Sequence, residues 1–304
     1  MGIIARQSIK GTIVTYMGVA VGFLTTFFVL TRFLSAEEIG LARVLVDAAT
    51  LFIGLAQLGT NTSIIRFYPY FKDADTRDHG FFFYTLVVPL FGFLLFALVY
   101  WACHIPLGNW FGDKSPLFMD YYYMVLPLAF FMLYQTIFET NANVLMRIVV
   151  PRAVRELVVR IGMLALYLLY AFRILSMDGF VIGLCLNYAV AALVNLAYLF
   201  AVGHISLRPD WTFLRDNPSL VRNYLLYTGF LFISAVASVL APALSSFFIT
   251  AKMGLDSTGI YAIATYIAVM VSIPYRSVTA IASPQLAHAI KEQDRQGASR
   301  LIHQ

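Results

Sequence analysis

Polar side chains recur along single faces of several long apolar segments, and these are the residues whose types could do chemistry. Asp47, Gln57 and Asn61 belong to one such stripe, in which polar or small residues follow one another at steps of three or four. Glu139 and Asn143 belong to a second stripe with a spacing of four. That spacing places each set on one face of a helix. Because lipid penalises polar groups, both faces must turn toward protein or water, and we interpret them as lining a water-accessible cavity.

The charged members of these stripes allow more than one chemistry. Arg276 lies in the middle of an apolar segment, so it could meet an anionic head group or form an internal pair with Asp47 or Glu139. Asp47 follows Arg43 by four residues, which makes an intrahelical ion pair at least as plausible as coupling to a proton or another ion. Glu139 has no cation within one helical turn, so it must meet a partner on another helix, bind a proton or bind a cation.

Other polar or small residues have simpler interpretations. The spacing of Gly18 and Gly22 is typical of close helix packing. Arg152, Arg155 and Arg160 follow an apolar segment, and we interpret them as anchors at the membrane surface. Acidic and basic residues alternate in the short segment 72–78, which predicts a solvated turn.

Composition excludes most soluble functions. The chain has 304 residues, of which 60% are apolar and 12% charged, and its mean hydropathy is +0.78. Its 21 Lys and Arg residues are scattered between apolar segments, so we predict no nucleic-acid partner. Neither the spacing of the His, Cys and acidic residues nor any known catalytic motif predicts a metal site, a cofactor or catalytic residues. We therefore do not expect an enzyme.

The elements that position the stripes are apolar blocks of about twenty residues, the length of membrane-spanning helices. They predict an all-α polytopic membrane protein with about eight transmembrane helices. Fifteen Lys and Arg residues lie on one alternate set of loops and five on the other, which predicts cytoplasmic N- and C-termini. The predicted segments are 11–31, 44–66, 81–103, 121–146, 156–176, 179–203, 223–250 and 258–285.

The chain also contains an internal repeat at an offset of 219 residues. Thr31 aligns with Thr250, and Gly40 aligns with Gly259, in two turns that join apolar segments. The repeat predicts a six-helix lobe over 1–219 and the first two helices of a second lobe over 220–304. We therefore expect the natural chain to continue beyond residue 304.

Three segments carry a family resemblance: RQSIKGTIVTY from residue 6, LSAEEIGLARVL from residue 34 and ASPQLAHAIKEQD from residue 282. Together they resemble the polysaccharide biosynthesis proteins, which are lipid-linked oligosaccharide flippases of the O-antigen type. These belong to the same exporter superfamily as the multidrug and toxic compound extrusion transporters. The resemblance implies a multi-pass protein of the bacterial inner membrane, with two six-helix lobes around a cavity.

The resemblance further implies that the protein moves undecaprenyl-diphosphate-linked sugar units for the biosynthesis of lipopolysaccharide and other surface polysaccharides. Family proteins use cavity arginines for the diphosphate. Arg276 is the deep candidate here, and Arg66 and Arg6 lie near the inner mouth. The partners are then the lipid-linked oligosaccharide and membrane lipid, with H⁺ or Na⁺ as a coupling ion through Asp47 or Glu139.

Two other functions remain open at this stage. A cation- or proton-coupled drug antiporter of the same superfamily would need a small, acid-lined pocket. A membrane glycan polymerase or ligase would need a large outer loop with catalytic Arg or His. The longest predicted outer loop, about 103–120, offers few such groups, so the polymerase is the weaker alternative.

Overall fold

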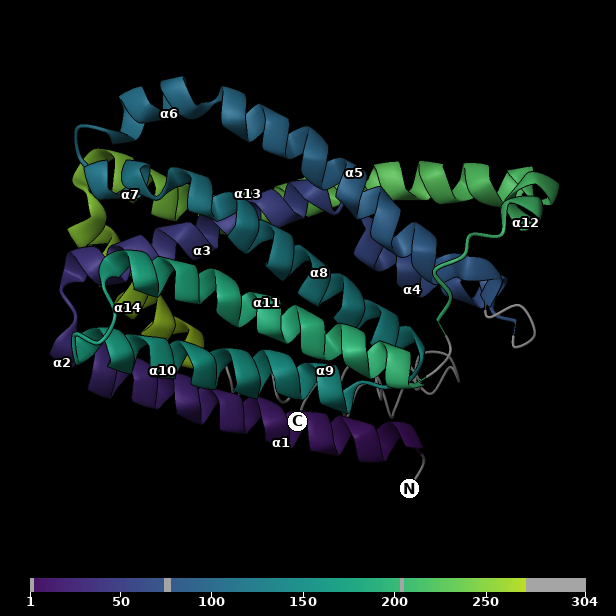
Figure 1. Ribbon diagram of the computed structural model, residues 1–304, viewed down its shortest axis with the longest axis horizontal. Coiled ribbons are helices and arrows are strands. Elements are labelled where there is room, and N and C mark those ends of the chain that lie inside the picture. Colours follow the sequence, from purple (N-terminus) through teal and green to yellow (C-terminus); the bar gives the residue numbers. More distant parts are fainter. Residues whose placement is uncertain (1–2, 74–77, 203–204, 272–304) are drawn as a thin grey trace, which may run out of the picture. The chain divides into compact units, whose positions relative to one another are not determined.

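The computed structural model describes residues 3–73, 78–202 and 205–271, and every regular element in these ranges is helical (Figure 1). The chain forms two compact units, residues 1–259 and 260–304, and the described part of the second is the continuation of one helix, residues 260–271. In chain order the elements are α1 (Ile3–Leu24), η1 (Thr25–Leu30), α2 (Thr31–Phe33), α3 (Ala36–Ala56), α4 (Thr60–Phe71), η2 (Asp78–Gly80), α5 (Phe81–Ala102), α6 (His104–Phe111), α7 (Pro116–Asp120), η3 (Tyr122–Met124), α8 (Val125–Val144), α9 (Val149–Ala153), η4 (Val154–Val158), α10 (Val159–Ala171), α11 (Met177–Val202), α12 (Trp211–Asp216), α13 (Pro218–Met253) and α14 (Leu255–Val271).

Each predicted apolar segment is mainly helical in the described part of the chain, although α10 ends at Ala171, before the end of the segment 156–176, and α8 covers only Val125–Val144 of the segment 121–146. The segment predicted as a single helix over 44–66 consists of α3 and α4, separated where Leu58 (φ 49°) and Gly59 (φ 76°) adopt left-handed backbone. Within the described residues, four helical segments are long and apolar enough to cross a membrane. They are Lys10–Phe33, Ala36–Ala56, Asp78–Ala102 and Met177–Val202. The chain is thus a helical membrane protein, as composition predicts.

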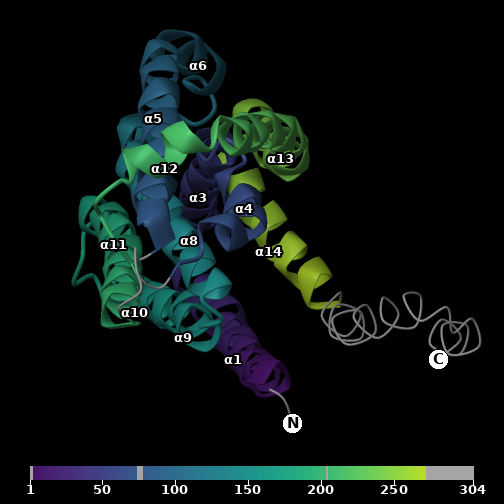
Figure 2. The same cartoon turned by 90° about the vertical axis from the view of Figure 1, so that its right-hand side faces the viewer.

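The core of the first unit is built around α8 and α3. The helix α8 packs against α11, α3, α4 and α5, and α3 packs in addition against α13. Figure 1 shows α1, α10, α11 and α8 side by side, and Figure 2 shows α3 between α5 and α13. Leu45 of α3, Leu133 and Ile137 of α8 and Leu184 of α11 are almost fully buried in this core. The polar stripes of α3 and α8 therefore share helices with the best-packed part of the unit.

The start of α3 is fixed by its own sequence. Ser35 and Glu38 form a capping box: the Ser35 hydroxyl accepts from the Glu38 amide, and the Glu38 carboxylate accepts from the Ser35 amide at 2.8 Å. These bonds satisfy amides that would otherwise lack partners at a helix N-terminus. Tyr170 of α10 donates its hydroxyl proton to the other Glu38 oxygen. The turn that the repeat identifies is therefore held by both local and long-range bonds.

Two segments are π-helical: η1, between α1 and α2, and η4, between α9 and α10. Such turns are rare and often lie at functional sites. The segment η4 packs on α1, where a Cβ atom on Gly18 would lie 2.5 Å from the carbonyl oxygen of Glu156. The packing interpretation of the small residues in the first helix is confirmed at Gly18, because only a residue without a side chain permits this approach.

The two glycines aligned by the repeat make a reciprocal contact. A Cβ on Gly40 would lie 2.0 Å from the carbonyl oxygen of Leu255, and a Cβ on Gly259 would lie 2.0 Å from that of Ala36. Leu255 is the residue that the 219-residue offset aligns with Ala36. A reciprocal contact of this kind is made by two copies related by a two-fold axis. We refer to it as the glycine seam. The division into lobes at 219–220 stays a prediction.

Candidate functional site

The predicted site residue Asp47 forms an ion pair and a hydrogen bond within the protein. Its Oδ2 atom lies 2.7 Å from Nε of Arg43 and accepts a hydrogen bond from Ser246 at 2.6 Å. The first contact is the intrahelical pair allowed by the i, i+4 spacing. The second ties α3 to α13 across 199 residues of sequence. Asp47 therefore joins α3 to α13, and its carboxylate already has two partners.

Gln57 and Asn61 lie together at the break between α3 and α4. The Asn61 amide donates to Gln57 Oε1 at 2.8 Å, while Asn61 Oδ1 is buried without a protein partner. Helix α13 packs against this break. Ser63 and Thr228 share a hydrogen bond of 2.7 Å, and a Cβ on Gly59 would lie 2.8 Å from the Thr228 carbonyl oxygen. The break therefore places the polar side chains of Gln57 and Asn61 beside the contact between α4 and α13.

Arg66 extends from α4 and is exposed. Its guanidinium carbon lies 4.1 Å from the ring centroid of Tyr227 on α13. This cation–π contact holds the stem of the side chain while leaving N–H donors free to meet an anion. Its predicted place near the inner mouth of a cavity stays a prediction.

Glu139 meets a partner on another helix, which was one of the three possibilities left open by the sequence. Its Oε1 atom lies 2.9 Å from Nη1 of Arg155 in η4. Arg155 also contacts Glu156 at 3.3 Å, and Glu156 lies 2.9 Å from Arg160. Arg160 in turn donates to the carbonyl oxygen of Gly18 at 3.1 Å. We call Glu139, Arg155, Glu156 and Arg160 the ion cluster.

Arg155 and Arg160 have a structural role beside the predicted one as anchors at the membrane surface, which stays a prediction. Both hold carboxylates of the ion cluster: Arg155 pairs with Glu139 of α8, and Arg160 pairs with Glu156 in η4, which packs against α1. The third, Arg152, lies over α1, where a Cβ on Gly11 would be 2.8 Å from its Nη1 atom. Sequence reasoning missed the cluster because the pairs join residues of different helices.

The ion cluster is asymmetric in its exposure. The Glu139 side chain is only 9% exposed, whereas that of Arg155 is 48% exposed. One partner is therefore held in the protein interior while the other reaches the surface. On the same α8 stripe, Gln135 Nε2 and Asn143 Oδ1 are buried without protein partners, so they can bond a water or a ligand group.

The structure brings only some of the predicted residues together. Gln57 pairs with Asn61, and Glu139 pairs with an arginine that was not predicted. Within the described ranges, neither Gln57 nor Asn61 makes a hydrogen bond or ion pair with Glu139. Arg276 lies outside the described residues. The shared water-accessible cavity remains a prediction.

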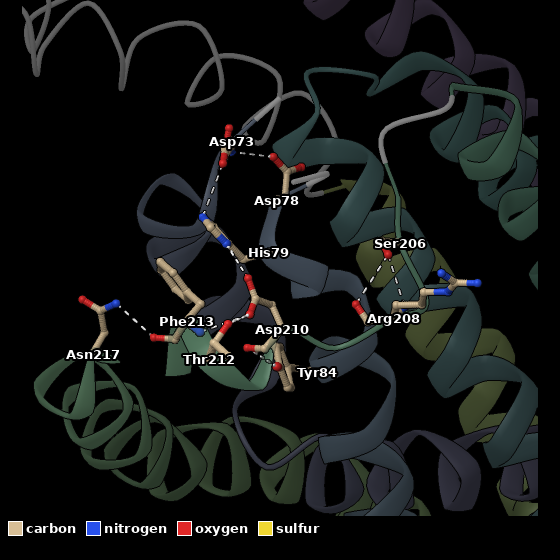
Figure 3. Close-up of polar contacts among 10 residues, drawn as sticks. All are labelled: Asp73, Asp78, His79, Tyr84, Ser206, Arg208, Asp210, Thr212, Phe213 and Asn217. Atoms are coloured by element: carbon tan, nitrogen blue, oxygen red, sulfur yellow. Dashed lines mark hydrogen bonds and ion pairs between the residues drawn. The ribbon is translucent and has the colours of Figure 1, made fainter. Parts of the chain in front are cut away.

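A second polar group, shown in Figure 3, joins the α4–α5 loop to the segment before α13. His79 Nδ1 lies 2.9 Å from Asp210 Oδ2, His79 Nε2 lies 3.5 Å from Asp73 Oδ2, and the imidazole stacks on Phe213 at 4.0 Å. We call His79, Asp210 and Phe213 the loop clamp. Hydrogen bonds from Thr212 and from His79 hold the pKa of Asp210 below its usual range.

The prediction of a solvated turn over 72–78 is wrong at Asp78, and residues 74–77 of that turn lie outside the described residues. Asp78 is buried and accepts hydrogen bonds from the Tyr68 hydroxyl and the Asp73 amide, both at 3.0 Å. Asp78 and His79 have positive φ angles, which turn the loop sharply into α5. Sequence reasoning missed the clamp because His79 and Asp210 are 131 residues apart.

Comparison with known proteins supplies the family. Among the described residues no group of His, Cys, Asp and Glu is arranged to hold a metal ion. No curated protein and no solved structure matches the chain. A family model described as polysaccharide biosynthesis protein matches residues 8–287. The chain therefore belongs to the polysaccharide biosynthesis protein family and, with its long apolar helices, is a polysaccharide-related membrane protein.

Proposed function

We propose that the protein is a multi-pass transporter of the bacterial inner membrane that flips undecaprenyl-diphosphate-linked oligosaccharide units for surface polysaccharide biosynthesis, and that it is not an enzyme. Family membership is the observation that carries this proposal. The glycine seam supports it because it joins the equivalent turns of the two predicted repeats, and the Asp47–Ser246 bond supports it because it joins α3 of the first to α13 of the second. Transporters built from two repeats bind substrate between them and move one repeat against the other.

The ion cluster supplies a way to bind the diphosphate. A guanidinium group matches phosphate oxygens with two parallel hydrogen bonds. Arg155 is half exposed and can turn toward a ligand, whereas its partner Glu139 is fixed on a buried helix face. Arg66 is exposed at a second place where α4 meets α13. A diphosphate engaged by Arg155 would compete directly with Glu139 for the same guanidinium.

This competition couples substrate binding to an ion. When Arg155 turns to the diphosphate, Glu139 is left as a buried carboxylate without its partner. An unpaired buried charge is costly, so the carboxylate would bind H⁺ or Na⁺ at that moment. Release of the substrate would restore the Glu139–Arg155 pair and expel the ion. Glu139 is the better coupling residue than Asp47, whose carboxylate is held by both Arg43 and Ser246.

The proposal is tested by reconstituting the full chain in proteoliposomes with a fluorescent lipid-linked oligosaccharide and measuring its transfer between leaflets. Arg155→Ala should reduce transfer at least about tenfold, since a charge-assisted hydrogen bond contributes roughly 1.5–3 kcal/mol. Glu139→Gln should retain binding but lose the dependence of transfer on a pH or Na⁺ gradient. Arg173→Ala, which changes an arginine outside the ion cluster, is the matched control.

Surface polysaccharide export in cells provides the second arm, with Arg276→Ala beside Arg155→Ala. Unchanged export in both variants would refute the proposed diphosphate role of these arginines. Normal surface glycans together with increased drug sensitivity in the Glu139→Gln strain would instead favour a drug antiporter. Export of units with altered chain length but normal amount would favour a polymerase.

A further inference from the structure

The first unit contains an apolar cavity that the proposed transport mechanism does not use. Its volume is about 340 Å³, and α3, α5, α6, α7 and α13 contribute its walls. That size lies in the range of roughly 300–1,000 Å³ typical of small-molecule sites. Residues of four of these helices define it: Leu51, Val99, Trp110, Leu244 and Phe247.

The cavity wall offers no free hydroxyl to a polar ligand. Its two tyrosines bond to each other's backbone: the Tyr100 hydroxyl donates to the Tyr122 carbonyl oxygen at 3.1 Å, and the Tyr122 hydroxyl donates to that of Tyr100 at 2.7 Å. Their rings stack at 4.2 Å with an interplanar angle of 6°. The remaining wall residues are apolar apart from the Cys103 thiol and the indole N–H of Trp110. The chemistry of the wall therefore selects a hydrocarbon.

The rim of the cavity opens toward lipid. Val99 is 50% exposed, Leu244 41% and Trp110 36%, and all three line the cavity. Val99 lies on α5, a segment long and apolar enough to span the membrane and mostly unburied by protein. A hydrocarbon chain can thus enter sideways from the bilayer. At about 30 Å³ for a group the size of a water molecule, the volume holds roughly eleven methylene groups.

We propose that this cavity binds one acyl chain of a membrane phospholipid, inserted between α5 and α13. Phospholipid acyl chains are the hydrocarbon that surrounds every spanning helix, and the cavity volume accommodates a large part of one chain. The acyl chain would fill the space between α3 and α13 beside the hydrogen bond from Ser246 to Asp47. The inference rests on membrane insertion and not on the substrate proposed above.

The experiment is photo-crosslinking of the full chain in nanodiscs that contain a phospholipid with a diazirine in its acyl chain. Mass spectrometry of the digested protein locates the adducts. Adducts are expected on cavity residues, Phe247 among them. Val99→Trp places a large ring at the rim and should lower their yield about tenfold, because displacing two methylene groups changes occupancy by roughly that factor. Leu98→Trp is the matched control, since Leu98 is 65% exposed and does not line the cavity.

Two results would overturn the proposal. One is a distribution of adducts that follows exposure alone, with Leu94 and Leu98 labelled as strongly as the cavity and no difference between the two Trp variants. The other is loss of cavity adducts on adding a polyprenyl phosphate but not on adding unlabelled phospholipid, which would assign the cavity to a prenyl chain. A thermal unfolding midpoint equal to that of the native chain shows that Val99→Trp is folded. If it is not, Leu51→Phe replaces it.

Discussion

The glycine seam allows a prediction whose size follows from the geometry. In Gly40→Ala the new methyl group would lie 2.0 Å from the Leu255 carbonyl oxygen, whereas real Cβ contacts are essentially never shorter than 3.0 Å. The two turns must therefore separate by at least about 1 Å. Because the obstacle is backbone, it cannot rotate aside as a flexible side chain would.

The expected loss of stability comes from two opposing terms. Overpacking costs about 1–3 kcal/mol, and a clash with backbone belongs at the upper end. Alanine returns up to about 1 kcal/mol of helix propensity. Gly40→Ala should therefore destabilise the protein by about 2 kcal/mol, and Gly259→Ala by a similar amount. Both substitutions open the same seam, so the double variant should lose about 2–3 kcal/mol rather than the sum of about 4 kcal/mol.

Thermal unfolding of the native chain, the two single variants and the double variant in one detergent measures these effects. A loss of about 2 kcal/mol lowers the midpoint by roughly 4 °C in a chain of this size. Gly229→Ala is the matched control, because Gly229 lies in α13 with nothing within 4 Å of the added Cβ. Strictly additive effects, or a Gly40→Ala midpoint equal to that of Gly229→Ala, would refute the reciprocal packing.

Three further predictions concern single sites. Because the pKa of Asp210 is lowered in the folded state, its carboxylate stabilises the fold at pH values above its unfolded-state pKa of about 3.9. This contribution is lost as the pH falls through the folded-state pKa. Asp210→Asn should therefore flatten the acid dependence of the unfolding midpoint below about pH 4. Gly59→Ala should destabilise by more than about 1 kcal/mol, since Gly59 combines a φ of 76° with the Thr228 carbonyl oxygen 2.8 Å from an added Cβ, and chemical denaturation measures the loss. Asn195→Leu should raise the midpoint, because both polar side-chain atoms are buried without protein partners; a fall would indicate a bound water or polar ligand.

Much of the fold follows from local pattern. Apolar blocks of about twenty residues predict helices because lipid leaves the backbone no other arrangement. The capping box at Ser35 and the small residue at Gly18 are equally local signals, and the structure places both as their types suggest. The break at Leu58 and Gly59 does not show in the sequence pattern, because the polar residues Gln57 and Asn61 keep the helical spacing of four across it.

The candidate site was predictable only in part. The spacing of Glu139 showed that it needs a partner from elsewhere, but not that Arg155 is that partner, because periodicity reports a helix face and not its neighbour. The loop clamp is a stronger case, since His79 and Asp210 meet through tertiary structure alone. Hydropathy also cannot separate an apolar cavity wall from an apolar core, so nothing in the sequence distinguished Val99 from Leu98.

The π-helical segment η4 has a consequence for insertions and deletions. A π turn holds about one residue more than an α turn, and each residue of a helix turns the chain by about 100°. Deleting one residue within Val154–Val158 would therefore convert η4 to regular helix and leave Arg160 facing as before, whereas the same deletion in α10 would turn every later residue by about 100°. In a relative that is one residue shorter here, only the residues within η4 change direction, Arg155 and Glu156 among them. A single-residue gap at this segment therefore marks a change in the ion cluster, and not the drift of a surface loop.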